Sequence, residues 1–218
     1  MTANLVSFLK AKKDRKVIFS SSMSKKKVNS PVDFSFQVIA GQLKGRTITA
    51  PDLGVTRPPL SRIRRSIFDF LMPFLPDSRY LDLFSGTGSY LFEAVSRGVV
   101  KAVGVEKEPK LAESINVQAQ VFDIGDKLYC RCDDVFEALP KLKSSHEKFD
   151  IIMIAPPQYK GIIDETLKCL RQYPVLADSG FLLCQHDSSE TDRIESLDFK
   201  IKDQRKYGNT TFTILIAE

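Results

Sequence analysis

The chain has 218 residues, 43% of them hydrophobic, which is enough to build one domain around a proper core. No apolar run approaches the roughly 20 residues of a membrane span, and the N-terminus lacks the long apolar block of a secretory signal, so we expect a cytoplasmic protein that binds no membrane. Four cysteines and two histidines show no metal-ligand spacing, which argues against a metal enzyme.

Positive charge is concentrated at the N-terminal end. Residues 1–65 hold 14 Lys/Arg and three Asp, whereas the remaining residues hold 18 Lys/Arg and 24 acids. This pattern suits a polyanion that docks at one edge of the molecule. Within this part, residues 1–33 combine lysine clusters with a serine run and weak periodicity, which predicts a basic, disordered leader.

Residues 34–76 predict a small hairpin followed by a helix. The chain alternates loosely from 34 to 49 and contains two glycines, a pattern typical of a β-hairpin. Ser61 is the predicted N-cap of a helix that runs through Met72. Its apolar residues, with Phe74 among them, form one inward-facing stripe, so Arg62 and Arg65 are expected to face outward.

From residue 77 to 218, strands and helices alternate. The predicted strands lie near residues 80–84, 101–106, 127–131, 149–154, 180–185, 198–204 and 211–217. The predicted helices lie near 89–97, 109–121, 134–142, 161–171 and 188–196. Short apolar strands between amphipathic helices predict an α/β domain with a seven-stranded, mainly parallel, Rossmann-like sheet covered on both faces. The short link at 207–209 makes the last two strands an antiparallel edge hairpin.

The most informative segment is Tyr80-Leu-Asp-Leu-Phe-Ser-Gly-Thr-Gly88. Asp82 lies at the carboxyl end of a buried strand, and Gly86 and Gly88 remove side chains where the backbone must approach a ligand closely. The following helix offers free N–H groups at its N-terminus. Ligands of open α/β sheets bind at this location.

Two cofactor classes compete for this turn. A dinucleotide fingerprint requires a third glycine where Leu91 stands and no acid in the strand, and a pyrophosphate would be repelled by Asp82. The sulfonium and ammonium groups of S-adenosyl-L-methionine would be attracted. Glu106, at the end of the next strand, can accept hydrogen bonds from both ribose hydroxyls, and Asp134 can reach an adenine amine. These acids favour S-adenosylmethionine, and a degenerate pocket that binds nothing is the alternative.

These residues resemble the class I S-adenosylmethionine-dependent methyltransferases. Upstream, Ile39-Ala-Gly-Gln-Leu-Lys-Gly-Arg46, Thr56-Arg-Pro-Pro59, Arg62-Ile-Arg64 and Phe68 are similar to the N-terminal signature of one bacterial family. That family is the 16S ribosomal RNA guanine-N2 methyltransferases, which modify a single guanine of the small subunit (the position-966 type). The resemblance covers about residues 36–217.

The resemblance implies roles for two sets of residues. The cofactor would be held by Asp82, Gly86, Gly88, Glu106 and Asp134. The residues that would face RNA phosphates or shape the cofactor entrance are Lys44, Arg46, Arg57, Arg62 and Arg64. Residues 34–76 would therefore be the RNA-facing part.

The double-proline loop is the expected catalytic element, with Ala155, Pro156, Pro157 and Tyr159 as its residues. The family pattern is Asp or Asn, two prolines, then Tyr or Phe. The acid or amide and a backbone carbonyl hold the target amine, and the ring stacks on the base. Here Ala155 replaces the acceptor, and loss of one transition-state contact typically costs about 2.7–4 kcal/mol. The Pro156 carbonyl can still accept, and Gln158 can substitute in part.

Three functions follow from this pattern. The first is methylation of a guanine N2 amine by a monomeric enzyme that acts on 16S ribosomal RNA or a 30S assembly intermediate. The second is a catalytically weakened, RNA-binding assembly factor, suggested by Ala155. The third, a DNA adenine or protein glutamine methyltransferase, is disfavoured because the chain has no target-recognition domain and carries the Arg-Pro and Arg-x-Arg signature.

Overall fold

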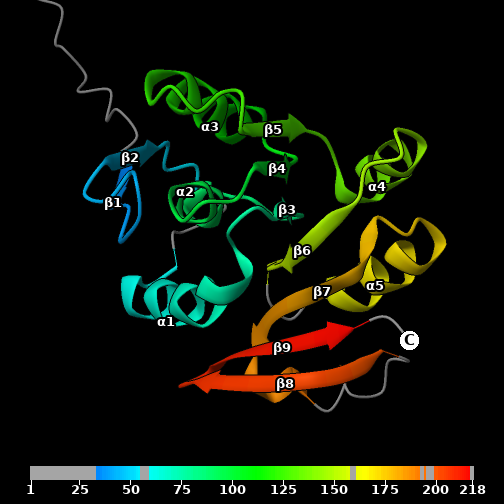
Figure 1. Ribbon diagram of the computed structural model, residues 1–218. Coiled ribbons are helices and arrows are strands. Elements are labelled where there is room, and N and C mark those ends of the chain that lie inside the picture. The colour runs from blue at the N-terminus through cyan, green and yellow to red at the C-terminus, as the bar shows by residue number, and fades with distance from the viewer. Residues whose placement is uncertain (1–32, 55–58, 158–160, 192–193, 195–198, 217–218) are drawn as a thin grey trace, which may run out of the picture. The chain divides into compact units, whose positions relative to one another are not determined.

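A seven-stranded sheet organises the protein (Figure 1). The computed structural model describes residues 33–54, 59–157, 161–191, 194 and 199–216. Its strand order is β5-β4-β3-β6-β7-β9-β8, with the first five strands parallel and β9 antiparallel between β7 and β8. The strands are β3 (Arg79–Asp82), β4 (Lys101–Glu106), β5 (Leu128–Cys132), β6 (Phe149–Ile154), β7 (Leu176–Asp187), β8 (Lys200–Tyr207) and β9 (Thr210–Ile216). The predicted Rossmann-like architecture with an antiparallel edge hairpin is confirmed.

The strand order reverses at β3. β4 and β5 extend the sheet on one side of β3, and β6 and β7 extend it on the other. Asp82 pairs in register with Gly104 of β4 and with Met153 of β6, so the carboxyl ends of the three strands lie at one edge. A crevice is expected outside such a reversal, because the connections leave the two neighbouring strands in opposite directions.

Helices cover both faces of the sheet (Figure 1). One face packs against α1 (Ser61–Leu71), α2 (Ser89–Ser96) and α3 (Pro109–Val121), and the other against α4 (Val135–Ser144) and α5 (Ile162–Gln172). Buried residues such as Phe68, Leu91 and Ile115 belong to the first core, and Leu139 and Leu167 to the second. The described residues also form the 3-10 helices η1 (Met72–Phe74) and η2 (Ser188–Glu190). No helix among the described residues is both long and apolar enough to cross a bilayer.

The N-terminal hairpin packs onto the end of α2. β1 (Phe34–Gln37) and β2 (Thr47–Ala50) pair antiparallel, as predicted. In the connecting loop, Gln42 N–H donates to the Ser96 carbonyl at 2.7 Å. Gly41 has φ +85°, and a Cβ there would lie 1.8 Å from the same carbonyl oxygen, so this close approach requires glycine.

Arg64 is a buried ion-pair partner, a contact that the sequence analysis did not predict. Its side chain is 2% exposed, and its Nε lies 3.2 Å from Oε1 of the buried Glu93. The same carboxylate accepts from Ile39 N–H at 2.7 Å and pairs with Arg97 at 3.4 Å. Arg64 also donates to the Gln37 carbonyl at 2.7 Å. A charged side chain is stable inside a protein when paired in this way, so Arg64 fastens α1 to the hairpin and to α2.

Other boundaries also differ from the prediction. Ser61 is the first residue of α1 rather than its cap, and Phe74 is 49% exposed because the helix ends before it. β7 begins at Leu176, since the polar residues before Gly180 continue the strand through an irregular register. Of the helix predicted at 188–196, the structure shows η2, and most of the rest lies outside the described residues. Arg62 and Arg65 are exposed, as predicted.

The buried charge network predicts a large effect of one substitution. Glu93→Gln removes the counter-charge of Arg64 and should lower the free energy of unfolding by about 3–5 kcal/mol. Asp69→Asn is the matched control, because this exposed partner of Arg97 should contribute less than about 1 kcal/mol. Urea unfolding of the three proteins measures both values. Equal, small effects for the two variants would contradict the assignment of Glu93 as the central ion-pair partner.

Candidate functional site

A cavity of about 650 Å³ lies at the edge of the sheet where the strand order reverses. The turn after β3, the ends of β4 and β5, the double-proline loop after β6 and Gln185 of β7 line it. The volume lies within the range of pockets that enclose ligands of nucleoside size.

Most of the predicted site residues meet in this cavity. Its lining includes Gly86, Glu106, Asp134, Ala155, Pro156 and Pro157. Asp82 is 0% exposed and lies behind the wall rather than on it. Gly88, the N-cap of α2, has φ +77°, and a Cβ there would lie 2.8 Å from the Ile115 side chain, so it shapes the turn from behind. Tyr159 and Arg57 lie outside the described residues.

Two backbone groups fix the Glu106 carboxylate at the cavity wall. Gly86 N–H donates to Oε2 at 2.7 Å, and Glu108 N–H donates to Oε1 at 2.9 Å. Each carboxylate oxygen retains a further lone pair. Glu106 is therefore a pre-oriented acceptor suited to a pair of hydroxyl groups.

Asp82 is a buried acid with incomplete hydrogen bonding. Its Oδ1 accepts from Phe84 N–H at 3.2 Å, while Oδ2 has no hydrogen-bond partner among the described residues. Burial, together with the nearby charge of Glu106, raises the pKa of Asp82 from 3.8 to about 7. A cation bound nearby would favour the ionised form, so this acid is suited to a positively charged ligand.

The cavity wall as a whole is acidic. Four of its residues are acids, Glu106, Glu108, Asp133 and Asp134, against the single Lys107. Asp134 caps α4 by accepting from Phe136 N–H at 2.9 Å, so this side chain is already partly engaged by its own helix. Such a wall repels a pyrophosphate and attracts a cation, which disfavours a dinucleotide.

The chain matches the family described as Conserved hypothetical protein 95 over residues 36–216. It belongs to this family. The chain is 26% identical over 162 residues to Ribosomal RNA small subunit methyltransferase D of Escherichia coli K12, a match that covers 74% of this chain and 80% of that protein. The protein of the same name from Buchnera aphidicola is 28% identical over 155 residues, covering 71% and 79%.

Solved structures of similar chains have the same fold. A hypothetical protein of Thermus thermophilus superposes with a TM-score of 0.68 at 26% identity, covering 84% of this chain and 99% of that one. The yhhF protein of Escherichia coli gives a TM-score of 0.71 at 21% identity, covering 84% and 97%. The second likeness concerns the fold alone.

A small hollow adjoins the main cavity, and two residues that the sequence analysis missed line it. This hollow, of about 120 Å³, lies between Pro59, the glycine turn, Tyr90, Ala155 and Gln185. The Tyr90 hydroxyl donates to Oε1 of Gln185 at 2.6 Å. A polar residue directly after the apolar run 181–184 was a readable signal for Gln185.

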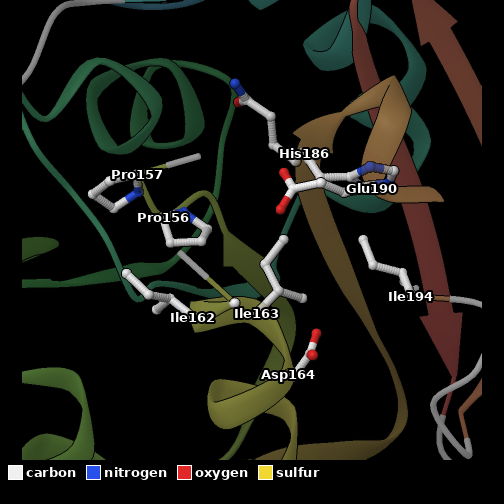
Figure 2. Close-up of a pocket in the computed structure, with 10 residues that line it drawn as sticks. Pro156, Pro157, Ile162, Ile163, Asp164, His186, Glu190 and Ile194 are labelled. Carbon is white, nitrogen blue, oxygen red and sulfur yellow. The ribbon is translucent and has the colours of Figure 1, made fainter. Parts of the chain in front are cut away.

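Apolar packing supports the double-proline loop from its other side. Figure 2 shows Pro156 and Pro157 near Ile162 and Ile163. These four residues line a cavity of about 10 Å³, which can hold at most a water molecule. His186 also lines this cavity. Burial lowers its pKa, and its Nε2 lies 2.8 Å from the Thr213 hydroxyl. We therefore assign this cavity to support of the loop.

The raised pKa of Asp82 predicts a pH-dependent stability. Because the folded pKa of about 7 exceeds 3.8, the contribution of Asp82 to stability is full below about pH 4 and is lost as the pH rises through 7. Between pH 5 and 8, the wild type should therefore lose stability relative to Asp82→Asn, by about 2.6 kcal/mol. Urea unfolding at both pH values measures this difference. The exposed Asp126→Asn control should show none, and a pH-independent difference for Asp82→Asn would contradict the assignment.

Proposed function

We propose that this protein transfers a methyl group from S-adenosylmethionine to the N2 amine of a guanine in the 16S ribosomal RNA of the small subunit. The observation that carries the proposal is one acidic, nucleoside-sized cavity that ends at a double-proline loop. The family match and the names of the relatives support the same activity. We further propose that the protein acts as a monomer in the cytoplasm, where ribosomal subunits are assembled.

The residues of the cavity fit this cofactor. We assign Glu106 to the ribose hydroxyls, because its two oxygens are held by backbone N–H groups and still have lone pairs. Asp134 is assigned to the adenine end, and Asp82, below the glycine turn, to the positive charge of the sulfonium and ammonium groups. When bound, the cofactor supplies an electrophilic methyl group. Gly86, which lines the cavity, would let the backbone approach it closely, and Gly88 would keep the turn packed against Ile115.

The double-proline side of the cavity provides the target site. The hollow beside Ala155 opens along the same loop, and we assign it to the flipped base. A guanine amine is a weak nucleophile, because its lone pair is delocalised into the ring. Acceptors that hold the amine hydrogens orient the lone pair for in-line attack. Pro156 and Tyr159 are proposed as backbone acceptor and stacking ring, respectively.

A basic groove provides the surface for the RNA backbone. It lies between the N-terminal hairpin and α1 and encloses about 810 Å³. Its basic lining residues are the exposed Lys44 and Arg65 and the largely buried Arg64. Pro59 lines both this groove and the hollow beside Ala155, so the groove leads towards the target site. Exposed lysine and arginine side chains bind phosphates without reading sequence, which suits the positioning of a structured RNA.

Ala155 keeps a second candidate function open. A catalytically weakened relative could keep the groove and bind small-subunit RNA as an assembly factor. The two functions differ in one measurable property, which is whether methyl groups are transferred.

A transfer assay tests the proposal. Purified protein is incubated with methyl-labelled S-adenosylmethionine and either 30S particles or free 16S RNA from a strain that lacks the gene, and nucleosides are identified by mass spectrometry. We expect labelled N2-methylguanosine, formed on one of the two substrates. Glu106→Gln should weaken cofactor binding and abolish the label, whereas the exposed Glu113→Gln should not. RNA binding without any methylated nucleoside would instead support the assembly factor.

Charge reversal tests the groove. The double variant Lys44→Glu/Arg65→Glu should weaken RNA binding and reduce the slope of log affinity against log salt by about 2, since two phosphate contacts are lost. Lys143→Glu/Lys168→Glu, on the exposed surfaces of α4 and α5, is the matched control with the same charge change. Filter binding across a salt series measures both slopes. Equal slopes for the two double variants would exclude the groove as the RNA surface.

A further inference from the structure

Gln185 lies beside Ala155, just beyond the last residue pair that β6 forms with β7. β6 and β7 are parallel, and Ile154 pairs in register with Cys184. Ala155, the first residue after β6, and Gln185, which still belongs to β7, are therefore at the same level of the sheet. Ile154 and Cys184 belong to the core under α4 and α5, so the following residues face the opposite side of the sheet, where Tyr90 of α2 lies.

The Gln185 amide is oriented and still has hydrogen-bonding capacity. Tyr90 is 5% exposed, and burial raises its pKa, so its hydroxyl stays protonated and donates to Oε1 at 2.6 Å. An amide oxygen accepts two hydrogen bonds, and the NH₂ group donates two more. The side chain lines both the cofactor cavity and the hollow beside Ala155. Its remaining lone pair and N–H groups are therefore available where the two spaces join.

We propose that Gln185 supplies the target-binding amide that the double-proline loop lacks at Ala155. This inference rests on the proposed function, because it names the acceptor for the same guanine amine. Neighbouring strands lie about 4.8 Å apart, and glutamine is one methylene longer than asparagine, so an amide anchored on β7 reaches toward the space beside Ala155. Tyr90, which fixes the amide, is a positioning residue.

The chemistry of the step is balanced without another reactant. The Gln185 oxygen accepts one N–H of the amine, and the nitrogen lone pair attacks the methyl carbon. The new C–N bond forms as the C–S bond of the sulfonium breaks, and sulfur keeps that electron pair. The extra proton on nitrogen passes to water. Gln185 contributes orientation of the amine and does not take up the proton.

Loss and rescue of the amide test this inference. Gln185→Ala should lower kcat for methyl transfer about 100-fold, the usual effect of losing one such donor or acceptor. The Kd for S-adenosylmethionine, measured by calorimetry, should change less than about threefold, because the cofactor's own acceptors remain. Adding Ala155→Asn to Gln185→Ala should raise kcat at least tenfold above that of Gln185→Ala alone. The exposed Gln120→Ala is the matched control and should match the parent.

A second variant separates a catalytic role from a structural one. Gln185→Glu keeps the side-chain length and the acceptor for the Tyr90 hydroxyl. This variant should transfer methyl groups well while the new carboxylate is ionised and poorly once it is protonated. Its kcat should therefore fall at low pH, where the kcat of the parent does not. Thermal unfolding of each variant shows whether the protein remains folded. A purely structural glutamine would give no such fall at low pH.

Several results would overturn the inference. A kcat of Gln185→Ala within threefold of the parent value would do so. A fall in kcat that Ala155→Asn does not reverse, in a variant that remains folded, would do so as well. A loss seen with Gln158→Ala and absent in Gln185→Ala would assign the amide to the loop instead. A parent that is inactive until Ala155→Asn is introduced would show that Gln185 does not compensate, while preserving the cofactor site and RNA target. A parent and Ala155→Asn variant that both fail to methylate RNA would remove the proposed function itself, and this inference with it.

Discussion

One buried carboxylate holds together the parts of the protein on which the site depends. Glu93 of α2 pairs with Arg64 of α1 and with Arg97, and it accepts from the backbone of Ile39 just after β1. α2 begins at the glycine turn of the cofactor cavity, whereas α1 and the hairpin form the walls of the basic groove. Because a buried charge is stable only while its partners stay in place, the groove and the turn are fixed relative to one another.

Beside the cavity, in contrast, a buried acid lacks a partner of opposite charge within the described part of the chain. Asp82 lies at the end of a strand, fully buried, with one oxygen unpartnered and a pKa near 7. In the free protein this acid costs stability whenever it is ionised. A cationic ligand would supply the missing counter-charge and remove this cost. The free energy that the free protein loses at Asp82 would then contribute to binding of the ligand. Glu106 differs, because two backbone N–H groups already stabilise its charge and prepare it for neutral hydroxyl donors. The two acids therefore suit different parts of one ligand.

The sequence predicts what depends on local pattern and fails where a distant contact decides. The fold and the meeting of Gly86, Glu106 and Pro156 follow from alternating strands and helices, because the carboxyl ends of parallel strands share one edge. The burial of Arg64 could not be foreseen, since its partner Glu93 lies 29 positions away on another helix. Phe74 shares the apolar spacing of α1 but lies beyond the end of that helix, where the stripe no longer faces the core. The spacing of apolar residues gives no information about the ion pair of Arg64 or about the exposure of Phe74.

The neighbourhood of Ala155 and Gln185 depends on the same distinction. Which residue of β7 lies beside Ala155 is set by a register that shifts between Phe149 and Ile151, and such an irregularity leaves no mark in the spacing of apolar residues. Judged from the loop sequence alone, the double-proline loop lacks a side-chain acceptor at Ala155. On the adjacent strand β7, however, the oriented amide of Gln185 lies at the same level. The transition state requires a lone pair at a point in space, and in a parallel sheet two residues 30 positions apart can provide it equally well. A loop pattern that lacks one residue is therefore insufficient to infer lost chemistry until the neighbouring strand ends are known.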